Sequence, residues 1–526
     1  MARKIFFVCA LLLPLCLWAL SGVWPGALWA FVGVGPLIGL GVHDVLQKRH
    51  SLLRVYPVVG HGRYLMEAFR PEMQQYFVES NIDGKPFSRE QRSVIYQRAK
   101  GDLDTMPFGT QREVYAGGYE WMNHSILPKP YLHDDPRVLV GGPACTKPYR
   151  ASHLNISAMS FGSLSPNAIL ALNMAAKQGG FAHNTGEGGI SPYHLQPGGD
   201  LIWQVGTGYF GCRTPEGGFD PERFAENAQR EVVKMIELKL SQGAKPGHGG
   251  ILPAAKLTRE IAQIRGVRMG HDVLSPPAHS AFGSPIGLLE FIAKLRELSG
   301  GKPVGFKLCV GKPADFLAIC KAMVKTGIIP DFITVDGAEG GTGAAPVELS
   351  NSVGTPLRQG LTFVDNALRG VGLRDKIRVI AAGKVVTGFH MFRLMALGAD
   401  MCNAARPMLF ALGCIQARRC NDNTCPVGVA TQDPSRAVGL VPEAKAPRVA
   451  RYHKATIKAY LELLGCAGLE SPRQVRRDMI LRQVDGFVAR TLAELYPQIE
   501  EGCLLSDATV PASFINDWQR ASAERF

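Results

Sequence analysis

The stretch PVGFKLCVGKPADFLAICKAMVKTGIIPDFITVDG, residues 303–337, contains one complete structural unit of this protein. Its first apolar run, PVGFKLCVG, is short and ends in glycine, which is typical of a buried strand. The next segment, PADFLAICKAMVKTG, is longer and carries apolar residues at helical spacing. Another short apolar run, DFITVDG, follows it. The stretch therefore predicts a strand, a helix and a second strand, as in a parallel βαβ unit.

The same alternation extends along the chain from Leu154. Further strands are predicted at LNISAMSFG (154–162), IRVIAAGKVV (377–386) and DMCNAARP (400–407), and further helices at SPNAILALNMAAKQ (165–178) and GFHMFRLMALGA (388–399). The strands are apolar on both faces, and their polar and glycine residues gather at the carboxyl ends, which indicates a helix-covered parallel sheet or a closed barrel. About 280 residues of such units, without a GxGxxG motif in the first, favour an α/β fold of the TIM (β/α)8 barrel type.

The first 45 residues differ in composition from the rest of the chain. Uncharged apolar stretches cover 5–24 and 27–42, and each is near the ~20 residues that a membrane-spanning helix needs. Basic residues precede and follow the pair, so the positive-inside rule predicts a helical hairpin with both ends, and the chain that follows it, in the cytoplasm. A cleaved signal peptide is the alternative, although two apolar stretches exceed one signal core. We expect location at the inner, or cytoplasmic, membrane.

Composition and periodicity also divide the chain into predicted parts. We expect a membrane hairpin at 1–45, a lead-in layer at 46–150, a barrel at 151–440 with an inserted cysteine loop at 413–434, and a helical cover at 441–526. The cover is predicted from RYHKATIKAYLELLGCAGL (451–469) and PRQVRRDMILRQV (472–484). The net charge of +13 is spread along the chain and forms no basic arm, which argues against nucleic acid. Twelve cysteines in 526 residues are too few for a disulfide scaffold.

Three of those cysteines, Cys414, Cys420 and Cys425, lie within one glycine- and proline-containing loop. Three thiolates in a loop can bind a soft metal ion or an iron–sulfur cluster. Tetrahedral zinc needs a fourth ligand, and the nearest histidine on the N-terminal side, His390, lies 24 positions before Cys414. An iron–sulfur cluster, a zinc site with a distant ligand and a purely structural turn all remain open on spacing alone.

The cysteine loop, CxxxxxCxxxxCPVGVATQ, resembles the iron–sulfur loop of glutamate synthase. Further blocks in that family's order are SAMSFGSLS (157–165), NTGEGG (184–189), KLSQGAKPG (239–247), LSPPAHS (274–280), GFKL (305–308) and GGTGAAP (340–346). With RPEMQQYFVES and PFSREQRSVIYQRAKG nearer the N-terminus, the whole chain is similar to stand-alone FMN-binding glutamate synthase family proteins, which keep the synthase domain and lack others. The resemblance implies an FMN and a [3Fe-4S] cluster held by the three cysteines.

The resemblance also implies an enzyme, an oxidoreductase acting on CH–NH2 donors. The expected reaction is reduction of 2-iminoglutarate, formed from 2-oxoglutarate and ammonia, to glutamate. No glutaminase and no nicotinamide-binding module are found in the sequence, so a separate protein or carrier is expected to donate electrons. A flavin-dependent enzyme for another amino acid or a methylated amine, a non-catalytic flavin-binding assembly protein and a zinc-stabilised barrel without flavin are the alternatives. The assembly state, monomer or homo-oligomer, stays open.

By resemblance, the flavin-binding residues lie at the ends of three strands. They are Ala158, Met159, Ser160 and Ser163 after the first strand, Gln204 in IWQVGTG and Lys307 in GFKL. Phosphate in TIM barrels commonly binds the loops after strands seven and eight, which makes Gly383, Lys384, Ala405 and Arg406 the phosphate candidates. Lys307 is expected to face the barrel interior, where its charge would stabilise a reduced anionic flavin.

The predicted substrate site surrounds two charged residues on glycine-containing loops. Glu187 in TGEGG is predicted to do acid/base work or to steer the substrate amine, and Lys245 in GAKPG to bind a carboxylate. Together with these two catalytic candidates, the predicted substrate contacts are Gly247, His248, Glu339 and Gly341. His248 stands where the family has glutamate, and Ala338 with Glu339 replaces its histidine–aspartate pair, so the identity of the substrate stays open.

Overall fold

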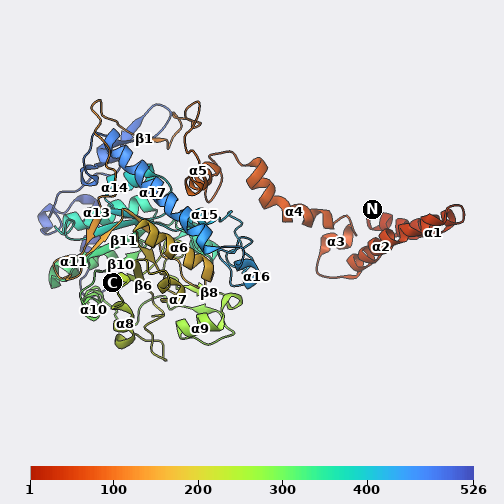
Figure 1. Cartoon of the computed structure of the whole chain (residues 1–526), viewed down its shortest axis with the longest axis horizontal. Coiled ribbons are helices and arrows are strands. Elements are labelled where there is room, and N and C mark those ends of the chain that lie inside the picture. Colours follow the sequence, from red (N-terminus) through yellow and green to blue (C-terminus); the bar gives the residue numbers. More distant parts are fainter. Residues whose placement is uncertain (1) are drawn as a thin grey trace. The chain divides into compact units, whose positions relative to one another are not determined.

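The computed structural model describes residues 2–526, and residues 91–526 contain a closed barrel of parallel strands, of which β6, β10 and β11 are labelled in Figure 1. The strands are β4 (Leu154–Ile156), β5 (His183–Asn184), β6 (Leu201–Val205), β7 (Val233–Lys239), β10 (Val304–Leu308), β11 (Phe332–Asp336), β12 (Arg378–Ala382) and β13 (Met401–Ala404). They pair in chain order, and β13 closes the ring by pairing in parallel with β4. The predicted TIM barrel is thereby confirmed.

Helices connect the strands and cover the barrel. They include α6 (Pro166–Gly179), α8 (Pro221–Ala228), α10 (Pro285–Leu298), α11 (Pro313–Thr326), α13 (Leu357–Gly370), α14 (Gly388–Ala396) and α15 (Arg406–Leu412). The start of α6 shows how the sequence sets these boundaries. The Ser165 side chain accepts a hydrogen bond from the Ala168 backbone N–H, and Pro166 occupies the first turn. The helix ends at Gly180, whose φ of +63° suits glycine.

The barrel interior changes from apolar to polar along the strand direction. A buried apolar cluster contains Ala182, Ile202, Met235, Phe332, Ile380 and Met401. Alternate residues of a strand point to the same face. The residue two positions after each of these cluster residues therefore also faces the barrel interior. Five of these positions are polar and buried, namely Asn184, Gln204, Glu237, Thr334 and Asn403. A polar layer therefore lies towards the carboxyl ends of the strands, on top of an apolar floor.

The C-terminal segment contains one helix that was predicted and lacks another. The predicted helix at 451–469 lies within α17 (Pro442–Cys466), which packs on α6 and α14. The second prediction, a helix at 472–484, is wrong, because this segment contains two short 3-10 turns and the strand β14 (Ile480–Gln483). It pairs in antiparallel fashion with β1 (Glu120–Met122) and with β15 (Ala489–Thr491). Partners distant in sequence thus override its local helical pattern.

The N-terminal part, residues 2–90, is a compact unit of its own, and residues 91–526 form the other. In the N-terminal unit, α1 (Ala2–Ser21) packs against α2 (Phe31–Leu46), and the short 3-10 turn η1 (Pro25–Ala30) connects the two helices. The two helices approach closely at Gly41, where an added Cβ would overlap the Phe6 ring. Residues 2–21 and 25–46 are each long and apolar enough to cross a membrane. The domain boundaries expected from the sequence stay predictions.

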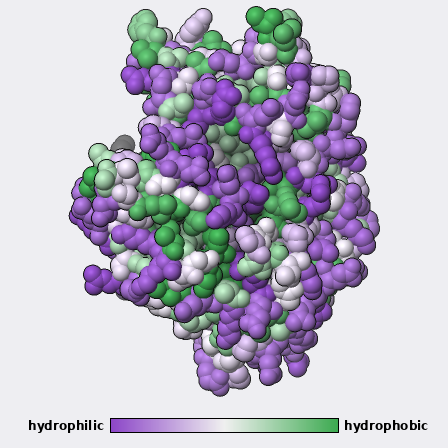
Figure 2. All heavy atoms as spheres, turned by 90° about the vertical axis from the view of Figure 1, so that its left-hand side faces the viewer, coloured by the Kyte–Doolittle hydropathy of each residue, from purple (hydrophilic) through white to green (hydrophobic). Residues whose placement is uncertain are grey.

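The face of the molecule in Figure 2 is mainly hydrophilic, with several smaller hydrophobic patches between the charged and polar groups. This is the ordinary surface of a folded globular domain.

Candidate active site

A buried ion pair lies at the carboxyl end of β7. The Lys239 ammonium Nζ is 2.7 Å from Glu187 Oε1 and 2.6 Å from Gln242 Oε1. Glu187 is tightly enclosed, since a Cβ added to Gly206 or Gly250 would clash with one of its carboxylate oxygens. Larger residues at these two positions would displace the carboxylate. The glycines thus allow backbone from two loops to approach one acidic group.

The charges around Glu187 favour its ionised form. Burial alone would raise the pKa of Glu187, but the ammonium of Lys239, with Arg265 and Lys245, outweighs burial and holds the pKa below its ordinary value. Burial also lowers the pKa of Lys245 to about 8, and the nearby Lys239 acts in the same direction. The site therefore combines a stable carboxylate with a lysine that can exchange its proton near neutral pH.

The predicted substrate residues occupy different positions in this site. Lys245 is buried and donates from Nζ to the Ala344 carbonyl oxygen at 2.9 Å, so it links two loops at the barrel mouth. Gly247 has a φ of +72°, a conformation that favours glycine. His248 is exposed, with Nδ1 2.9 Å from the carbonyl oxygen of Gly249. Lys245 and Glu187 thus belong to one group of charges, whereas His248 lies at the surface.

Glu339 has a structural partner that the sequence did not suggest. Its Oε2 accepts a hydrogen bond of 2.9 Å from the backbone N–H of Leu357, the first residue of α13. A carboxylate at the start of a helix satisfies a free N–H and interacts favourably with the helix dipole. Glu339 therefore holds the start of α13, and its predicted contact with substrate stays a prediction.

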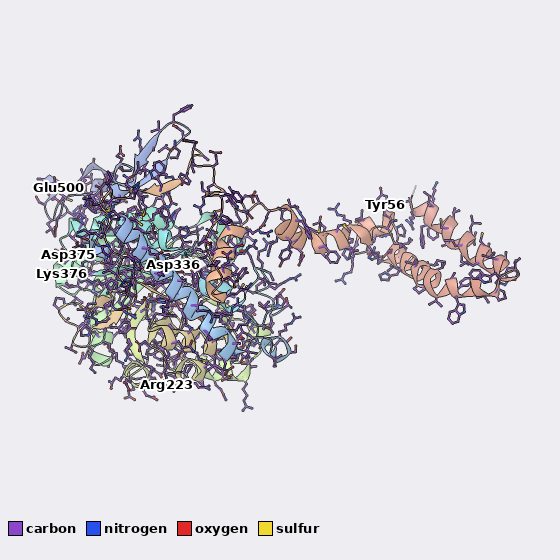
Figure 3. All side chains as sticks on the ribbon, turned by 45° about the horizontal axis from the view of Figure 1, so that its top comes forward. Tyr56, Arg223, Asp336, Asp375, Lys376 and Glu500 are labelled. Carbon is purple, nitrogen blue, oxygen red and sulfur yellow. The ribbon has the colours of Figure 1, made fainter. Side chains whose placement is uncertain are left out.

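Lys307 lies within the polar layer, as its predicted inward orientation requires. It is buried, and its Nζ is 3.4 Å from Asp336 Oδ2 in the next strand. Figure 3 labels Asp336 in the middle of the barrel unit. Burial would lower the pKa of Lys307, but the carboxylates of Asp336 and Glu237 raise it above the ordinary value. The layer therefore contains a permanent buried cation.

The loop after β4 packs against the glycine loop after β5. A Cβ added to Gly186 would lie 2.6 Å from the backbone nitrogen of Ser160, and the Gly188 N–H donates to Ser160 Oγ at 3.2 Å. Ala158 and Met159 precede Ser160 in this half-buried loop, and Ser163 follows it with its N–H donating to the Ser160 carbonyl. The loop presents small residues and backbone at the barrel mouth, where a flat ring could approach closely.

The predicted phosphate residues lie on the loops after β12 and β13. Gly383 has a φ of +152°, and Lys384 has a φ of +49°, which is uncommon for a residue with a side chain. Ala405 immediately precedes α15, and Arg406 begins it. The Arg406 guanidinium donates from Nη2 to the Thr342 carbonyl oxygen at 2.8 Å. It lies so close to Gly341 that a Cβ there would overlap Nη1.

The cysteine loop has an unusual backbone and is close to two cations, Arg406 and Lys256. Gln416, Arg418 and Asn423 all have positive φ, at 60°, 56° and 66°. Such strain in non-glycine residues is typical of functional loops. Burial raises the pKa of Cys414 to about 11, and the neighbouring thiols of Cys420 and Cys425 contribute in the same direction. The three thiols therefore influence one another.

Burial also raises the pKa of the Cys420 thiol, whereas Arg406 and Lys256 oppose this rise. Lys256 is buried and donates from Nζ to three carbonyl oxygens, those of Ser163 at 2.6 Å, Cys420 at 3.2 Å and Ala430 at 3.1 Å. Across residues 2–526, no three His, Cys, Asp or Glu side chains form a ready-made metal site. The donor chemistry suits a metal cluster with three thiolates, and binding would have to draw the thiols together.

Known proteins are similar to this chain in sequence over most of its length. Residues 144–470 match the conserved region in glutamate synthase. The glutamate synthase large subunit-like protein YerD of Bacillus subtilis is 38% identical over 489 residues, which cover 85% of this chain and 93% of YerD. The chain belongs to the glutamate synthase family. It is therefore an enzyme, an oxidoreductase of the glutamate synthase type.

Other members of the glutamate synthase family are longer than the segment they share with this chain. The archaeal glutamate synthase [NADPH] of Methanocaldococcus jannaschii is 38% identical over 323 residues, which cover 61% of this chain and 60% of that protein. Among solved structures, a mutant flavocytochrome b2 with benzoylformate has a TM-score of 0.42 at 12% identity, covering 83% of this chain and 90% of that chain. A mandelate oxidase has a TM-score of 0.41 at 15% identity, covering 76% and 98%.

The polar layer of this glutamate synthase relative has features that suit FMN. Asn403 Oδ1 is buried and has no hydrogen-bond partner among residues 2–526. Gln204 donates its amide nitrogen to Glu237 at 2.7 Å, which leaves the amide oxygen as its free group. The pyrimidine edge of a flavin carries both an N–H donor and carbonyl acceptors. The amide oxygens of Asn403 and Gln204 can accept a hydrogen bond from an N–H, and the Lys307 cation can interact with a carbonyl acceptor. The residues present therefore fit the cofactor.

Several residues of this site were not predicted from the sequence. They are Asn184, Glu237, Lys239, Lys256, Arg265, Asp336 and Asn403. Strand β7, with the sequence VKMIELK, carried a usable signal, because Glu237 and Lys239 are charged, two positions apart and inside a buried strand. For Lys256 and Arg265 the sequence gives no signal of a role in the site. They lie in a polar segment that is buried only because it packs against the cysteine loop and the loop after β4.

Proposed function

We propose that this protein is an FMN- and iron–sulfur-dependent oxidoreductase that forms glutamate from 2-oxoglutarate and ammonia through 2-iminoglutarate. The observation that carries the proposal is the enclosed pair of Lys239 and Glu187, with Lys245 and Arg265 in the same electrostatic group. Three cations around one carboxylate leave a net positive charge at the barrel mouth. Such a site favours a substrate with two carboxylates.

The residues of the site have separate roles in this proposal. Glu187 is ionised, because its pKa is lowered, and it would accept hydrogen bonds from the substrate nitrogen rather than donate a proton. Lys245, with a pKa of about 8, is suited to binding a carboxylate and to supplying a proton near neutral pH. Reduction of the C=N bond to CH–NH needs a hydride and a proton. When bound, FMN would supply the hydride, and a cluster on Cys414, Cys420 and Cys425 would supply electrons one at a time.

The protein's other groups would hold the cofactors. Lys307 and Gln204 would bind the flavin ring system beside the loop of Ala158, Met159, Ser160 and Ser163. Gly383, Lys384, Ala405 and Arg406 are proposed to bind its phosphate, since they lie after strands β12 and β13, where TIM barrels commonly bind phosphate. A separate protein or carrier would donate the electrons.

A membrane location is part of the proposal. Helix α1 and residues 25–46 are apolar, and their large side chains, such as Trp18 and Trp29, are exposed at 72% and 80%. Exposed side chains of this kind are suited to lipid. Lys48 and Arg49 follow the second helix, as expected for a cytoplasmic end. Resistance of the full chain to carbonate extraction would support the anchor, and recovery in the soluble fraction would contradict it.

The test of the proposed reaction uses the full chain purified anaerobically in detergent. Flavin absorbance, iron content and low-temperature EPR are recorded first. A chemical reductant then provides electrons, and 2-oxoglutarate is added with ammonium, glutamine or methylamine. Glutamate formed from ammonium, and lost in a Glu187→Gln variant that retains flavin, is the expected result. A protein that contains flavin but turns over only with another amine or amino acid would contradict glutamate synthesis, and a protein without flavin would overturn the proposal entirely.

A further inference from the structure

The most completely hydrogen-bonded group in the polar layer is the carboxylate of Glu237. It is 1% exposed and accepts three hydrogen bonds from three other strands. Asn184 Nδ2 donates to Oε1 at 2.8 Å, Gln204 Nε2 to the same oxygen at 2.7 Å, and Thr334 Oγ1 to Oε2 at 2.6 Å. A buried carboxylate is costly unless it is paired and hydrogen-bonded in this way.

These bonds determine which way two side-chain amides point. An amide has a donor end and an acceptor end of nearly equal size, and its environment selects the orientation. An ionised carboxylate accepts only, so it attracts the NH2 groups of Asn184 and Gln204. Asn184 Oδ1 is then used by the Gly186 N–H at 3.0 Å. Gln204 Oε1 has no corresponding protein donor within residues 2–526, so it remains available to a ligand.

Glu237 also acts on the buried cation. It is one of the two carboxylates, with Asp336, whose charges keep Lys307 protonated. In the barrel, β7 and β11 flank β10, so the two carboxylate-bearing strands lie on either side of the strand that carries Lys307. Glu237 therefore influences both the hydrogen-bond pattern and the net charge of the layer.

We propose that Glu237 is the positioning residue of the cofactor layer, which makes Gln204 present an acceptor to a ligand N–H and offsets the charge of Lys307. The inference rests on the proposed FMN site but is separate from it, because the buried Glu237 carboxylate is bonded to Asn184, Gln204 and Thr334 and acts through these neighbours. It specifies the class of ligand edge that fits here, namely one with an N–H donor facing Gln204 and acceptor atoms near Lys307.

Three variants of the full chain separate the two effects. In Glu237→Gln the amide oxygen can keep both amide donors, and its NH2 can donate to Thr334 after the hydroxyl rotates, so the pattern is kept and only the charge is lost. Glu237→Met removes both the charge and the pattern. Glu462→Gln makes the same chemical change in an exposed ion pair with Lys458, so it is the matched control.

FMN affinity and the flavin midpoint potential are measured for each variant after removal and readdition of FMN. We expect Glu237→Met to bind FMN about tenfold or more weakly, as for loss of a charge-assisted hydrogen-bond pattern. Glu237→Gln should bind FMN within about threefold of wild type but have a higher midpoint potential, because a buried negative charge is gone. Glu462→Gln should match wild type in both.

The outcomes distinguish this inference from the proposed function. If wild type binds no FMN, the proposed function fails. If wild type binds FMN and Glu237→Gln has an unchanged potential, the inference fails, because Glu237 then contributes only to structure. If Glu237→Met does not fold, the flavin midpoint potential of Glu237→Gln still tests the inference, since that variant keeps every hydrogen bond of Glu237.

Discussion

Lys239 and Glu187 form a 2.7 Å ion pair in which the lysine comes from the end of β7 and the glutamate from the glycine loop after β5. The side chains are 8% and 14% exposed, so solvent screens the pair little. Neither residue can be removed singly without leaving a buried charge at the barrel mouth.

Replacing Lys239 by methionine should therefore destabilise the protein by about 3 kcal/mol, because Glu187 is left buried without its cation. Chemical denaturation of the full chain in detergent measures the change. The double variant Lys239→Met/Glu187→Gln should recover most of the loss, since the carboxylate that Lys239 neutralises is removed as well. Lys325→Met, which breaks an exposed pair with Glu524, serves as control and should have little effect. Equal loss in the single and double variants would show that packing, not charge, matters here.

Binding of an anionic substrate should weaken as pH rises through about 8. Lys245 has its pKa lowered by burial to about 8, so the ammonium is present below that pH and lost above it. The expected result is a KM for 2-oxoglutarate that is constant below about pH 7 and rises about tenfold per pH unit well above 8. In a Lys245→Arg variant, whose charge persists, the KM should stay flat to about pH 9.5. A wild-type KM independent of pH across this range would exclude Lys245 as the carboxylate partner.

Removing the Lys256 ammonium should loosen the cysteine loop. A Lys256→Met variant leaves the carbonyls of Ser163, Cys420 and Ala430 without their donor. We expect amide hydrogen exchange across residues 416–430 to be about tenfold faster and the iron content of the purified protein to fall. Lys458→Met, which alters an exposed pair with Glu462, is the matched control. Unchanged exchange in the Lys256→Met variant would show that the loop is held by its other contacts.

Alanine at position 341 should displace the Arg406 guanidinium. The new Cβ would overlap Nη1, and the long arginine side chain can move without unfolding the protein. Because Arg406 opposes the rise in the pKa of Cys420, its displacement should make that thiol a weaker acid. Alkylation of Cys420 in metal-free protein, followed by peptide mapping, should slow severalfold at about pH 8. In Gly311→Ala, where an added Cβ meets no atom within 4 Å, alkylation should proceed at the wild-type rate.

The sequence was sufficient for the barrel because its signals are local. Strands that are apolar on both faces, followed by helices with clear periodicity, predicted β10, α11 and β11 within one stretch. The helix expected at 472–484 failed for the opposite reason. Its helical pattern was outweighed by pairing with β1, a strand more than 300 positions earlier, and nothing local indicates that partner.

For the candidate site, the sequence supplied residues on loops with distinctive motifs, such as Glu187 and Lys245. It did not supply the network that sets their charge states. Glu237 could have been noticed, because it is a charged residue inside the otherwise buried strand β7. Lys256 could not, because its burial arises only when the cysteine loop folds over it.

By itself the sequence determined the barrel class, five of the eight barrel strands, the apolar hairpin segments, the cysteine trio and membership of the glutamate synthase family, since each depends on residue type and spacing along the chain. Only the tertiary structure decided that Lys239 faces Glu187, that Glu237 orients Gln204 and that Lys256 lies under the cysteine loop. Hydrogen bonds and ion pairs act over a few ångströms in space, and the barrel brings these residues together from positions that are 33 to 174 apart along the chain.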